Sequence, residues 1–260
     1  MAGERGRDVV TYVLVHGGGS TGRFWDRLVP LLPGPALAVD LPGRAGVPGD
    51  LATLTVDDEV AAVVRTVAAA EVEWPVVLVA HSSGGLVVPG VVAASDGRVA
   101  HVVLNAALVP PEGGRGVDCM KPAHRDGLLA AIEAAERDGT TVTLPGPPAD
   151  PEVWRTTYGG DPLGDEDLAF VTDPVRCVPD TVHHYLQPVR WSVAGDVAVT
   201  YVVNDRDRPV RPERQLEMIG HLPVGADVVH LDGGHLPAVT APEALAEIIA
   251  TAGRRLEQPR

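Results

Sequence analysis

The sequence predicts an α/β fold, in which a mainly parallel sheet of about six strands is flanked by helices and interrupted by a helical insert. Strand-like and helix-like segments alternate along most of the 260 residues. The strand-like runs are apolar throughout, a pattern typical of parallel strands that are buried on both faces. The alternation stops between Pro110 and Arg190, where proline, glycine and charged residues are frequent.

Six apolar runs are expected to form the strands of the sheet. They lie at Val9–Val15, Ala36–Val39, Val76–Ala80, Val99–Leu104, Val197–Val203 and Asp227–Leu231. Between them, segments with apolar residues at helical spacing predict the covering helices. The predicted helices span Phe24–Leu32, Val56–Glu71, Ser83–Ala94, Pro212–Gly220 and Pro242–Arg254.

The interruption divides the chain into a core, residues 1–109 and 191–260, and a cap segment, residues 110–190. Leu128–Arg137 and Asp165–Val171 are the predicted helices of the cap segment, and no strand is expected within it. An insert of this kind between strands of one sheet predicts a lid.

The chain is acidic, with a formal net charge of −14 at pH 7. Such a surface repels phosphate backbones and anionic lipid headgroups, so neither nucleic acid nor a membrane is an expected partner. The N-terminal residues lack the apolar stretch of a signal peptide, and no run has the length of a membrane span, which favours the cytoplasm. A monomer and a homodimer are both compatible with the sequence.

The segment from Val79 to Gly85 carries the strongest functional signal. Ser82 follows an apolar strand, precedes a helix-compatible segment and has the small residues Ala80 and Gly84 two positions away on either side. This pattern is typical of a nucleophile elbow, a tight turn that lifts the serine hydroxyl above the sheet edge. N–H groups at the start of the following helix are then available to stabilise negative charge.

A serine nucleophile needs a histidine to accept its proton and a carboxylate to hold that histidine. In a sheet of this kind both partners are expected in loops after later strands, in the order Ser, Asp, His. Asp205 and Asp207 follow the strand that ends at Val203, and His235 follows the strand that ends at Leu231. The sequence therefore offers this order with two candidate acids.

These motifs resemble those of the α/β-hydrolase superfamily over nearly the whole chain. The resemblance is carried by His16-Gly17-Gly18, Phe24-Trp25, Asp40-Leu41-Pro42-Gly43, the Ser82 elbow, Asp205-Arg206-Asp207 and Gly234-His235. The chain is most similar to small carboxylesterases of the group that includes plant methylesterases and hydroxynitrile lyases. The resemblance implies the α/β-hydrolase fold with an inserted helical cap.

The resemblance also implies which residues act. Ser82, His235 and Asp207 correspond to the catalytic triad, with Asp205 as the second choice of acid. The backbone N–H of the residue after the nucleophile, Ser83, is one implied donor of the oxyanion hole.

The second implied oxyanion donor is the N–H of Gly18, where glycine allows the backbone to approach the substrate closely. Hydroxynitrile lyases of this group have a hydroxyl residue after the first histidine and a lysine directly after the catalytic histidine. This chain has Gly17 and Leu236 at these positions. The departure favours hydrolysis over cyanohydrin cleavage.

Residues beside the nucleophile, together with aromatic and apolar residues of the cap segment, are candidates for the substrate pocket. The candidates are Gly17, Trp25, His81, Met120, Leu128, Trp154, Tyr158 and Leu236. For the cap residues, packing within the lid is an equally good interpretation, and His81 is also interpreted as a local packing residue.

Several polar residues are interpreted as structural. His16 is expected to fix the oxyanion loop by hydrogen bonds, Asp40 to tie its turn, and His230 to be a satisfied residue of the core or of a sheet edge. The adjacent His183 and His184 would point in different directions on a strand or a helix, so joint metal binding is not expected. No metal and no cofactor are predicted.

The predicted function is a serine hydrolase that cleaves a carboxylic ester of a small molecule through an acyl-enzyme intermediate. Three alternatives remain open. The same pocket would also suit a lactonase, a thioesterase or an enzyme that cyclises or rearranges a natural product. The triad is also compatible with hydrolysis of a carbon–carbon bond, and the fold with binding of a ligand without catalysis. The single lysine, Lys121, among many arginines indicates a GC-rich bacterial genome, and the unfamiliar cap segment fits secondary metabolism.

Overall fold

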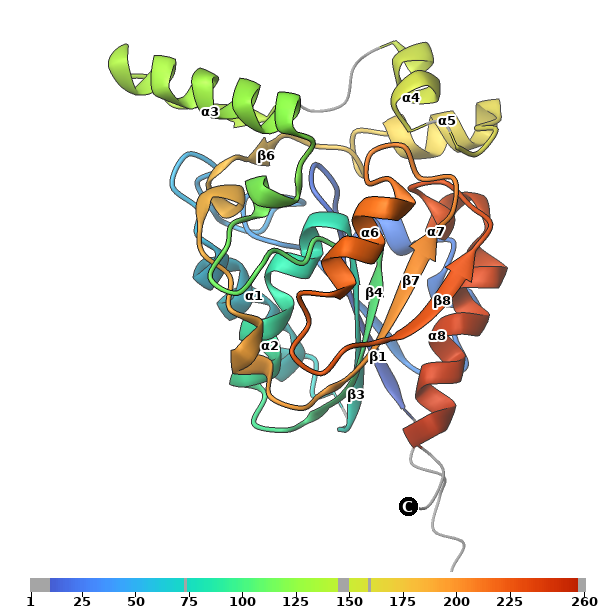
Figure 1. Ribbon diagram of the computed structural model, residues 1–260. Helices are drawn as coiled ribbons and strands as arrows, with labels where there is room; N and C mark the ends of the chain where they lie inside the picture. Colours follow the sequence, from blue (N-terminus) through green and yellow to red (C-terminus); the bar gives the residue numbers. More distant parts are fainter. Residues whose placement is uncertain (1–9, 73, 145–149, 159, 257–260) are drawn as a thin grey trace, which may run out of the picture.

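The computed structural model describes residues 10–72, 74–144, 150–158 and 160–256, and the predicted parallel sheet forms its centre (Figure 1). The strands of this sheet are β1 (Thr11–Val15), β2 (Ala36–Val39), β3 (Val76–His81), β4 (Val99–Asn105), β7 (Ala198–Asn204) and β8 (Asp227–Leu231). Their order is β2-β1-β3-β4-β7-β8, and all neighbouring pairs are parallel. The predicted fold class is confirmed, while Val9 lies outside the described residues.

Apolar side chains on the two faces of the sheet form two buried clusters. Val13 and Leu78 belong to one cluster, whereas Leu14 and Val79, their neighbours in β1 and β3, belong to the other. Successive side chains of a strand point to opposite faces, so a strand that is covered on both sides must be apolar at every position. This burial explains why the strand runs do not alternate with polar residues.

Helices cover both faces of the sheet, with α1 and α2 on one side and α8 on the other (Figure 1). The helices of the core are α1 (Val56–Ala69), α2 (Val88–Ala94), α6 (Pro212–Ile219), α7 (Pro237–Thr240) and α8 (Pro242–Leu256). The start of α1 is fixed by a capping box, in which Thr55 and Asp58 each accept a hydrogen bond from the backbone N–H of the other.

Two predicted helices are shorter and more irregular than expected. Phe24–Leu32 forms two 3₁₀ turns, η1 (Gly22–Trp25) and η2 (Val29–Leu31), because Pro30 lacks the N–H that would continue an α-helix. Likewise, the predicted helix Ser83–Ala94 begins as the 3₁₀ turn η3 (Ser82–Leu86), and α2 begins only at Val88. Both corrections concern regularity, because each segment still connects the predicted strands.

The cap segment contains more than the two predicted helices. Its helices are α3 (Pro122–Arg137), α4 (Pro151–Thr157) and α5 (Asp165–Thr172), and its 3₁₀ turns are η4 (Gly116–Cys119) and η5 (His183–Leu186). The short strands β5 (Thr143–Leu144) and β6 (Asp180–Thr181) pair antiparallel, so the expectation of no strand was wrong. Two residues are too few to produce a recognisable period. A further 3₁₀ turn, η6 (Trp191–Ala194), follows the segment.

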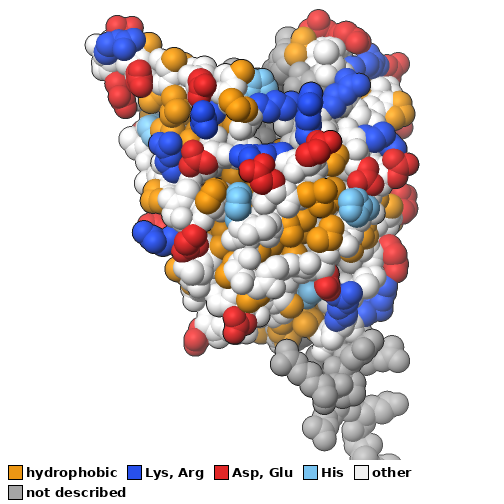
Figure 2. Space-filling model, viewed as in Figure 1, with side chains coloured by type: hydrophobic (Ala, Val, Ile, Leu, Met, Phe, Trp, Pro, Cys, Tyr) orange, Lys and Arg blue, Asp and Glu red, His pale blue; other side chains and the backbone are white. Residues whose placement is uncertain are grey.

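The helices of the cap segment lie beyond the carboxyl ends of the sheet strands (Figure 1). The flanks of the segment pack into the body of the protein, where Val117 and Val189 join a core cluster. By contrast, α3 has no buried residue and projects from the molecule (Figure 2). None of the described helices is both long and apolar enough to cross a membrane.

Candidate active site

Four loops at the carboxyl ends of strands build the candidate active site. The loop after β1, residues 16–19, precedes η1, and Ser82 follows β3 directly. Asp207 follows β7, and His235 follows β8. The parallel order of the sheet places all four loops on one edge, because parallel strands all end at the same edge.

The turn at Ser82 has the strained geometry expected of a nucleophile elbow. Ser82 has a φ of +51°, in the left-handed region that non-glycine residues rarely adopt. A Cβ atom on Gly84 would lie 2.6 Å from the carbonyl oxygen of His16, and Ala80 is fully buried. Small residues are therefore required on both sides of Ser82, as the sequence pattern indicated.

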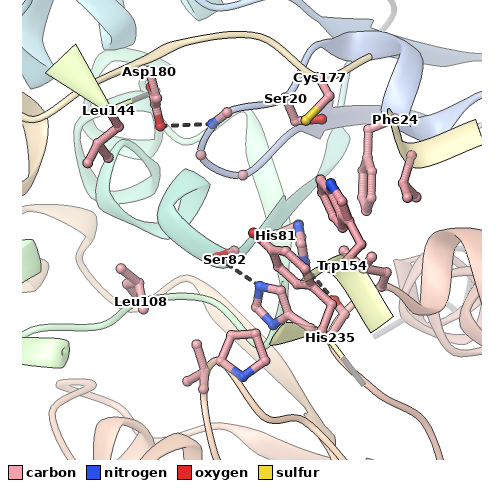
Figure 3. Close-up of a pocket in the computed structure, with 18 of the residues that line it drawn as sticks. Ser20, Phe24, His81, Ser82, Leu108, Leu144, Trp154, Cys177, Asp180 and His235 are labelled. Carbon is pink, nitrogen blue, oxygen red and sulfur yellow. Dashed lines mark hydrogen bonds between the residues drawn. The ribbon is translucent and has the colours of Figure 1, made fainter. Parts of the chain in front are cut away.

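Ser82, His235 and Asp207 form one chain of hydrogen bonds. Figure 3 shows its first contact, between Ser82 and His235. His235 Nε2 lies 3.2 Å from Ser82 Oγ, and His235 Nδ1 lies 2.6 Å from Asp207 Oδ2. The other oxygen of the Asp207 carboxylate accepts a hydrogen bond of 2.8 Å from the N–H of Val210. Both Asp207 and His235 are buried, so the carboxylate is held in one orientation toward the imidazole.

Asp205, the second candidate acid, faces a different histidine. Its Oδ1 lies 2.7 Å from Nδ1 of His230, and both side chains are exposed. His230 therefore lies on the edge strand β8 with a carboxylate partner, as expected for a satisfied edge residue. The two aspartates differ by two residues in sequence but serve different parts of the molecule.

The loop at residues 16–19, called the oxyanion loop below after its predicted role, lies against Ser82. A Cβ atom on Gly17 would be 2.9 Å from Ser82 Cβ. Gly18 N–H and Ser83 N–H have no acceptor among the described residues, so both remain available to a ligand. The structure thus places Gly18 and Ser83, the two predicted oxyanion donors, close to Ser82, the predicted nucleophile.

His16 holds the oxyanion loop from inside. Its Nε2 accepts a hydrogen bond from the N–H of Leu41, so Nδ1 carries the proton and donates to the carbonyl oxygen of Gly17 at 2.8 Å. Burial lowers the pKa of His16 to about 3, which keeps the ring neutral. Asp40 stabilises the neighbouring turn, because its Oδ1 accepts a hydrogen bond of 2.6 Å from the N–H of Gly22.

A cavity of about 430 Å³ opens beside Ser82, between the core and the cap segment (Figure 3). Six of the predicted pocket residues line it, namely Gly17, His81, Met120, Trp154, Tyr158 and Leu236. The rings of Trp154 and Tyr158 stack at 4.3 Å, and Tyr158 in turn lies 5.9 Å from the ring of His235. The cap segment therefore contributes an aromatic wall next to His235.

Two other predicted pocket residues do not line the cavity. Trp25 is completely buried among the core side chains, whereas its neighbour Phe24 lines the cavity instead. Leu128 packs half-buried against the core cluster. Because α3 runs away from the site, only its beginning, at Lys121 and His124, reaches the cavity.

His81 lies in the cavity wall and also bonds to the backbone of His235. Its Nε2 donates a hydrogen bond of 2.8 Å to the backbone carbonyl oxygen of His235, and its ring stacks on Phe24 at 4.9 Å. Burial lowers the pKa of His81 well below its usual value. The imidazole is therefore neutral and fixes the loop that carries His235.

A buried ionic network behind the oxyanion loop escaped the sequence analysis. Asp180 of β6 lines the cavity, and its Oδ2 accepts the N–H of Gly19 at 2.9 Å (Figure 3). Asp180 also pairs with Arg44, whose Nη1 lies 3.1 Å from Glu59 Oε1. No motif marks these residues, which are distant in sequence and belong to a loop, a helix and a two-residue strand.

One of the two adjacent histidines of the cap segment, His184, bonds to a buried carboxylate. His184 Nδ1 lies 3.1 Å from Glu59 Oε2, which makes His184 part of the same ionic network. Among the residues that the structure describes, no group of three or more His, Cys, Asp or Glu side chains is arranged to hold a metal ion.

The sequence profile of the alpha/beta hydrolase family matches residues 12–248. No curated protein is significantly similar to the chain in sequence. Among solved structures, a pyrethroid hydrolase from Sphingobium faniae JZ-2 has 22% identity and a TM-score of 0.74, with 96% of this chain and 100% of that chain covered.

Two further solved structures are also similar. An extracellular alpha/beta-hydrolase from a Paenibacillus species has 19% identity and a TM-score of 0.76, with 94% of this chain and 99% of that chain covered. A methylesterase from Arabidopsis has 21% identity and a TM-score of 0.70, with 95% of this chain and 100% of that chain covered. At such identities the similarity shows a shared fold.

Proposed function

This chain belongs to the alpha/beta hydrolase family, and from that membership we propose that it is a serine hydrolase that cleaves carboxylic esters of small molecules. The hydrogen-bond chain from Ser82 through His235 to Asp207, beside a cavity, carries the proposal. The similar structures include a hydrolase of pyrethroids and a methylesterase, which supports ester cleavage as the reaction.

The proposed reaction is a two-step acyl transfer. His235 Nε2 accepts the hydroxyl proton of Ser82 while Oγ attacks the ester carbonyl carbon. His235 then gives this proton to the leaving alkoxide, and the alcohol departs from the acyl-enzyme. A water molecule next gives a proton to Nε2 and attacks the acyl carbon, after which Ser82 Oγ takes the proton back and the acid leaves.

Asp207 acts through His235 in both steps. Its Oδ2 accepts a hydrogen bond from the protonated Nδ1 of His235. Nε2 therefore carries no proton and is free to accept the proton of the serine hydroxyl. The buried carboxylate also stabilises the imidazolium that forms in each step. The second hydrogen bond, from Val210 N–H, prevents the carboxylate from rotating away.

The backbone N–H groups of Gly18 and Ser83 are proposed to bind the oxygen that becomes negatively charged. Donors that are already in place need no reorganisation when the charge develops, and each is typically worth about 3 kcal/mol. Glycine at position 17 leaves room for the close approach of the loop to Ser82.

The cavity indicates a substrate of modest size with an apolar portion. Its volume of about 430 Å³ suits a small molecule, and Leu108, Met120, Leu144, Phe170 and Leu236 contribute apolar surface. We assign residues 110–190 the role of a lid, because they supply much of the wall opposite the nucleophile.

Replacing the nucleophile tests the proposal. Ser82→Ala is expected to lower the turnover of p-nitrophenyl acetate by several orders of magnitude and to leave the circular dichroism spectrum unchanged. Ser192→Ala is the matched control, because Ser192 is exposed and bonds to Glu112 away from the cavity. Undiminished turnover by Ser82→Ala would exclude the proposed mechanism.

A further inference from the structure

The cap segment reaches the oxyanion loop as well as the open side of the cavity. Besides the bond from Gly19 N–H to Asp180, the N–H of Val178 donates to the carbonyl oxygen of Gly19 at 3.0 Å. The 3₁₀ turn η5 follows within a few residues and carries Tyr185, which is buried and lines the cavity. The oxyanion loop is therefore held partly by the cap segment.

The Tyr185 hydroxyl lies next to both proposed oxyanion donors. A Cβ atom on Gly18 would be 2.5 Å from the Tyr185 hydroxyl oxygen, 2.7 Å from Asp180 Oδ2 and 3.2 Å from Ser83 Oγ. The hydroxyls of Tyr185 and Ser83 are also hydrogen-bond partners of each other. Two hydroxyls thus lie beside the two residues whose N–H groups would bind the oxyanion.

The hydroxyl pair of Tyr185 and Ser83 has one O–H hydrogen-bond donor that is not used within the pair. The two hydroxyls carry two protons, and the bond between them uses only one. Burial raises the pKa of Tyr185 to about 12, so its hydroxyl stays protonated at neutral pH. The nearby Asp180 carboxylate is engaged by the N–H of Gly19 and by the guanidinium of Arg44.

The position of Tyr185 is fixed by the neighbouring His184 and by the ionic network that holds β6. His184 packs edge-on against the Tyr185 ring at 4.1 Å and is held by Glu59, which is fully buried. Arg44 joins Glu59 to Asp180 of β6. A donor held in place by such a network is suited to stabilising charge, because it does not have to reorganise during the reaction.

We propose that the Tyr185 hydroxyl is a third hydrogen-bond donor to the oxyanion, beside the N–H groups of Gly18 and Ser83, and that the cap segment thereby contributes a catalytic residue. This inference rests on the proposed ester hydrolysis. It implies that the carbonyl oxygen of the substrate lies between the oxyanion loop and η5, with the acyl and alcohol portions directed elsewhere in the cavity.

Tyr185→Phe tests the inference, because it removes the hydroxyl and keeps the ring. With p-nitrophenyl acetate, kcat is expected to fall on the order of 100-fold while KM changes little. Binding of an aryl trifluoromethyl ketone, which forms a tetrahedral adduct with the serine, should weaken by a similar factor. A purely structural role would instead raise KM or lower the melting temperature without this selective loss.

Tyr201→Phe is the matched control. Tyr201 is fully buried, and its hydroxyl donates to the carbonyl oxygen of Ala107 at 2.7 Å, outside the cavity lining. This variant should keep kcat within about twofold, although it also loses a buried hydrogen bond. If Tyr185→Phe does not fold, Ser83→Ala tests the other end of the hydroxyl pair, and a tenfold loss in kcat is expected.

The outcomes separate this inference from the proposed function. Turnover within threefold of wild type in Tyr185→Phe, or in Ser83→Ala where that variant replaces it, would overturn the role of Tyr185. Ester hydrolysis would still stand if Ser82→Ala were inactive. Undiminished turnover in Ser82→Ala would overturn both.

Discussion

The environment of Asp207 makes it the acid of the candidate triad. Both oxygens of its carboxylate are engaged, one by His235 and the other by the N–H of Val210. Asp205 is only two residues away, yet it is exposed and pairs with His230. A carboxylate that is buried and held at both oxygens orients an imidazole, whereas an exposed surface pair contributes little.

Asp207→Asn is therefore expected to lower kcat for p-nitrophenyl acetate on the order of 10⁴-fold, because the amide no longer holds the productive tautomer of His235. Asp205→Asn provides a matched control at the surface and should stay within about twofold of wild type. Steady-state kinetics of both variants would check this. A larger loss of kcat in Asp205→Asn than in Asp207→Asn would identify Asp205 as the acid and contradict the prediction.

Among the elements, β6 is joined to the core by buried charges. Arg44, in the loop after β2, contacts Glu59 of α1 and Asp180 of β6, and all three side chains are almost completely inaccessible to solvent. The guanidinium also donates to the carbonyl oxygen of Pro42 at 3.2 Å. Buried ions of this kind depend on one another, because removing one leaves the others desolvated without compensation.

Arg44→Ala should lower the free energy of unfolding by about 3–5 kcal/mol, since two buried carboxylates would lose their cation. Arg255→Ala removes an exposed partner of Asp227 and should cost no more than about 1 kcal/mol. Urea unfolding of the two variants measures the difference. Equal destabilisation would show that the buried network does not hold the structure together.

At the scale of the whole molecule, burial of neutral histidines links stability to pH. His16 and His81 both have a lowered pKa, chiefly because burial disfavours the charged ring. In the unfolded chain these residues regain a pKa of about 6.5 and bind protons more readily than in the folded state. The unfolded state is therefore favoured as the pH falls below about 6.5.

Between pH 7 and pH 5 the free energy of unfolding is expected to fall by about 2 kcal/mol from His16 alone, and further from His81. The carboxylates of Asp58, Glu59 and Glu112 also have a lowered pKa, but they add a loss of stability only at more acidic pH. Urea denaturation at both pH values tests this. An unchanged free energy of unfolding would contradict it.

Much of the fold and part of the candidate site could be predicted from local pattern. Apolar runs identified all six strands of the main sheet. The central strands β1 and β3 are covered on both faces and therefore carry few polar residues, whereas the edge strand β8 is mostly exposed. The elbow around Ser82 could be predicted from the sequence, because its turn excludes side chains larger than glycine at position 84. The two-residue strands of the cap segment left no readable period.

By itself, the sequence determined the order of the strands along the chain and the position of Ser82 between strand and helix, since both depend on neighbouring residues. The tertiary structure decided that Asp207 meets His235, that Phe24 and not Trp25 lines the cavity, and that Tyr185 lies against Gly18. These outcomes depend on side-chain direction and on contacts between distant segments, which local periodicity does not encode.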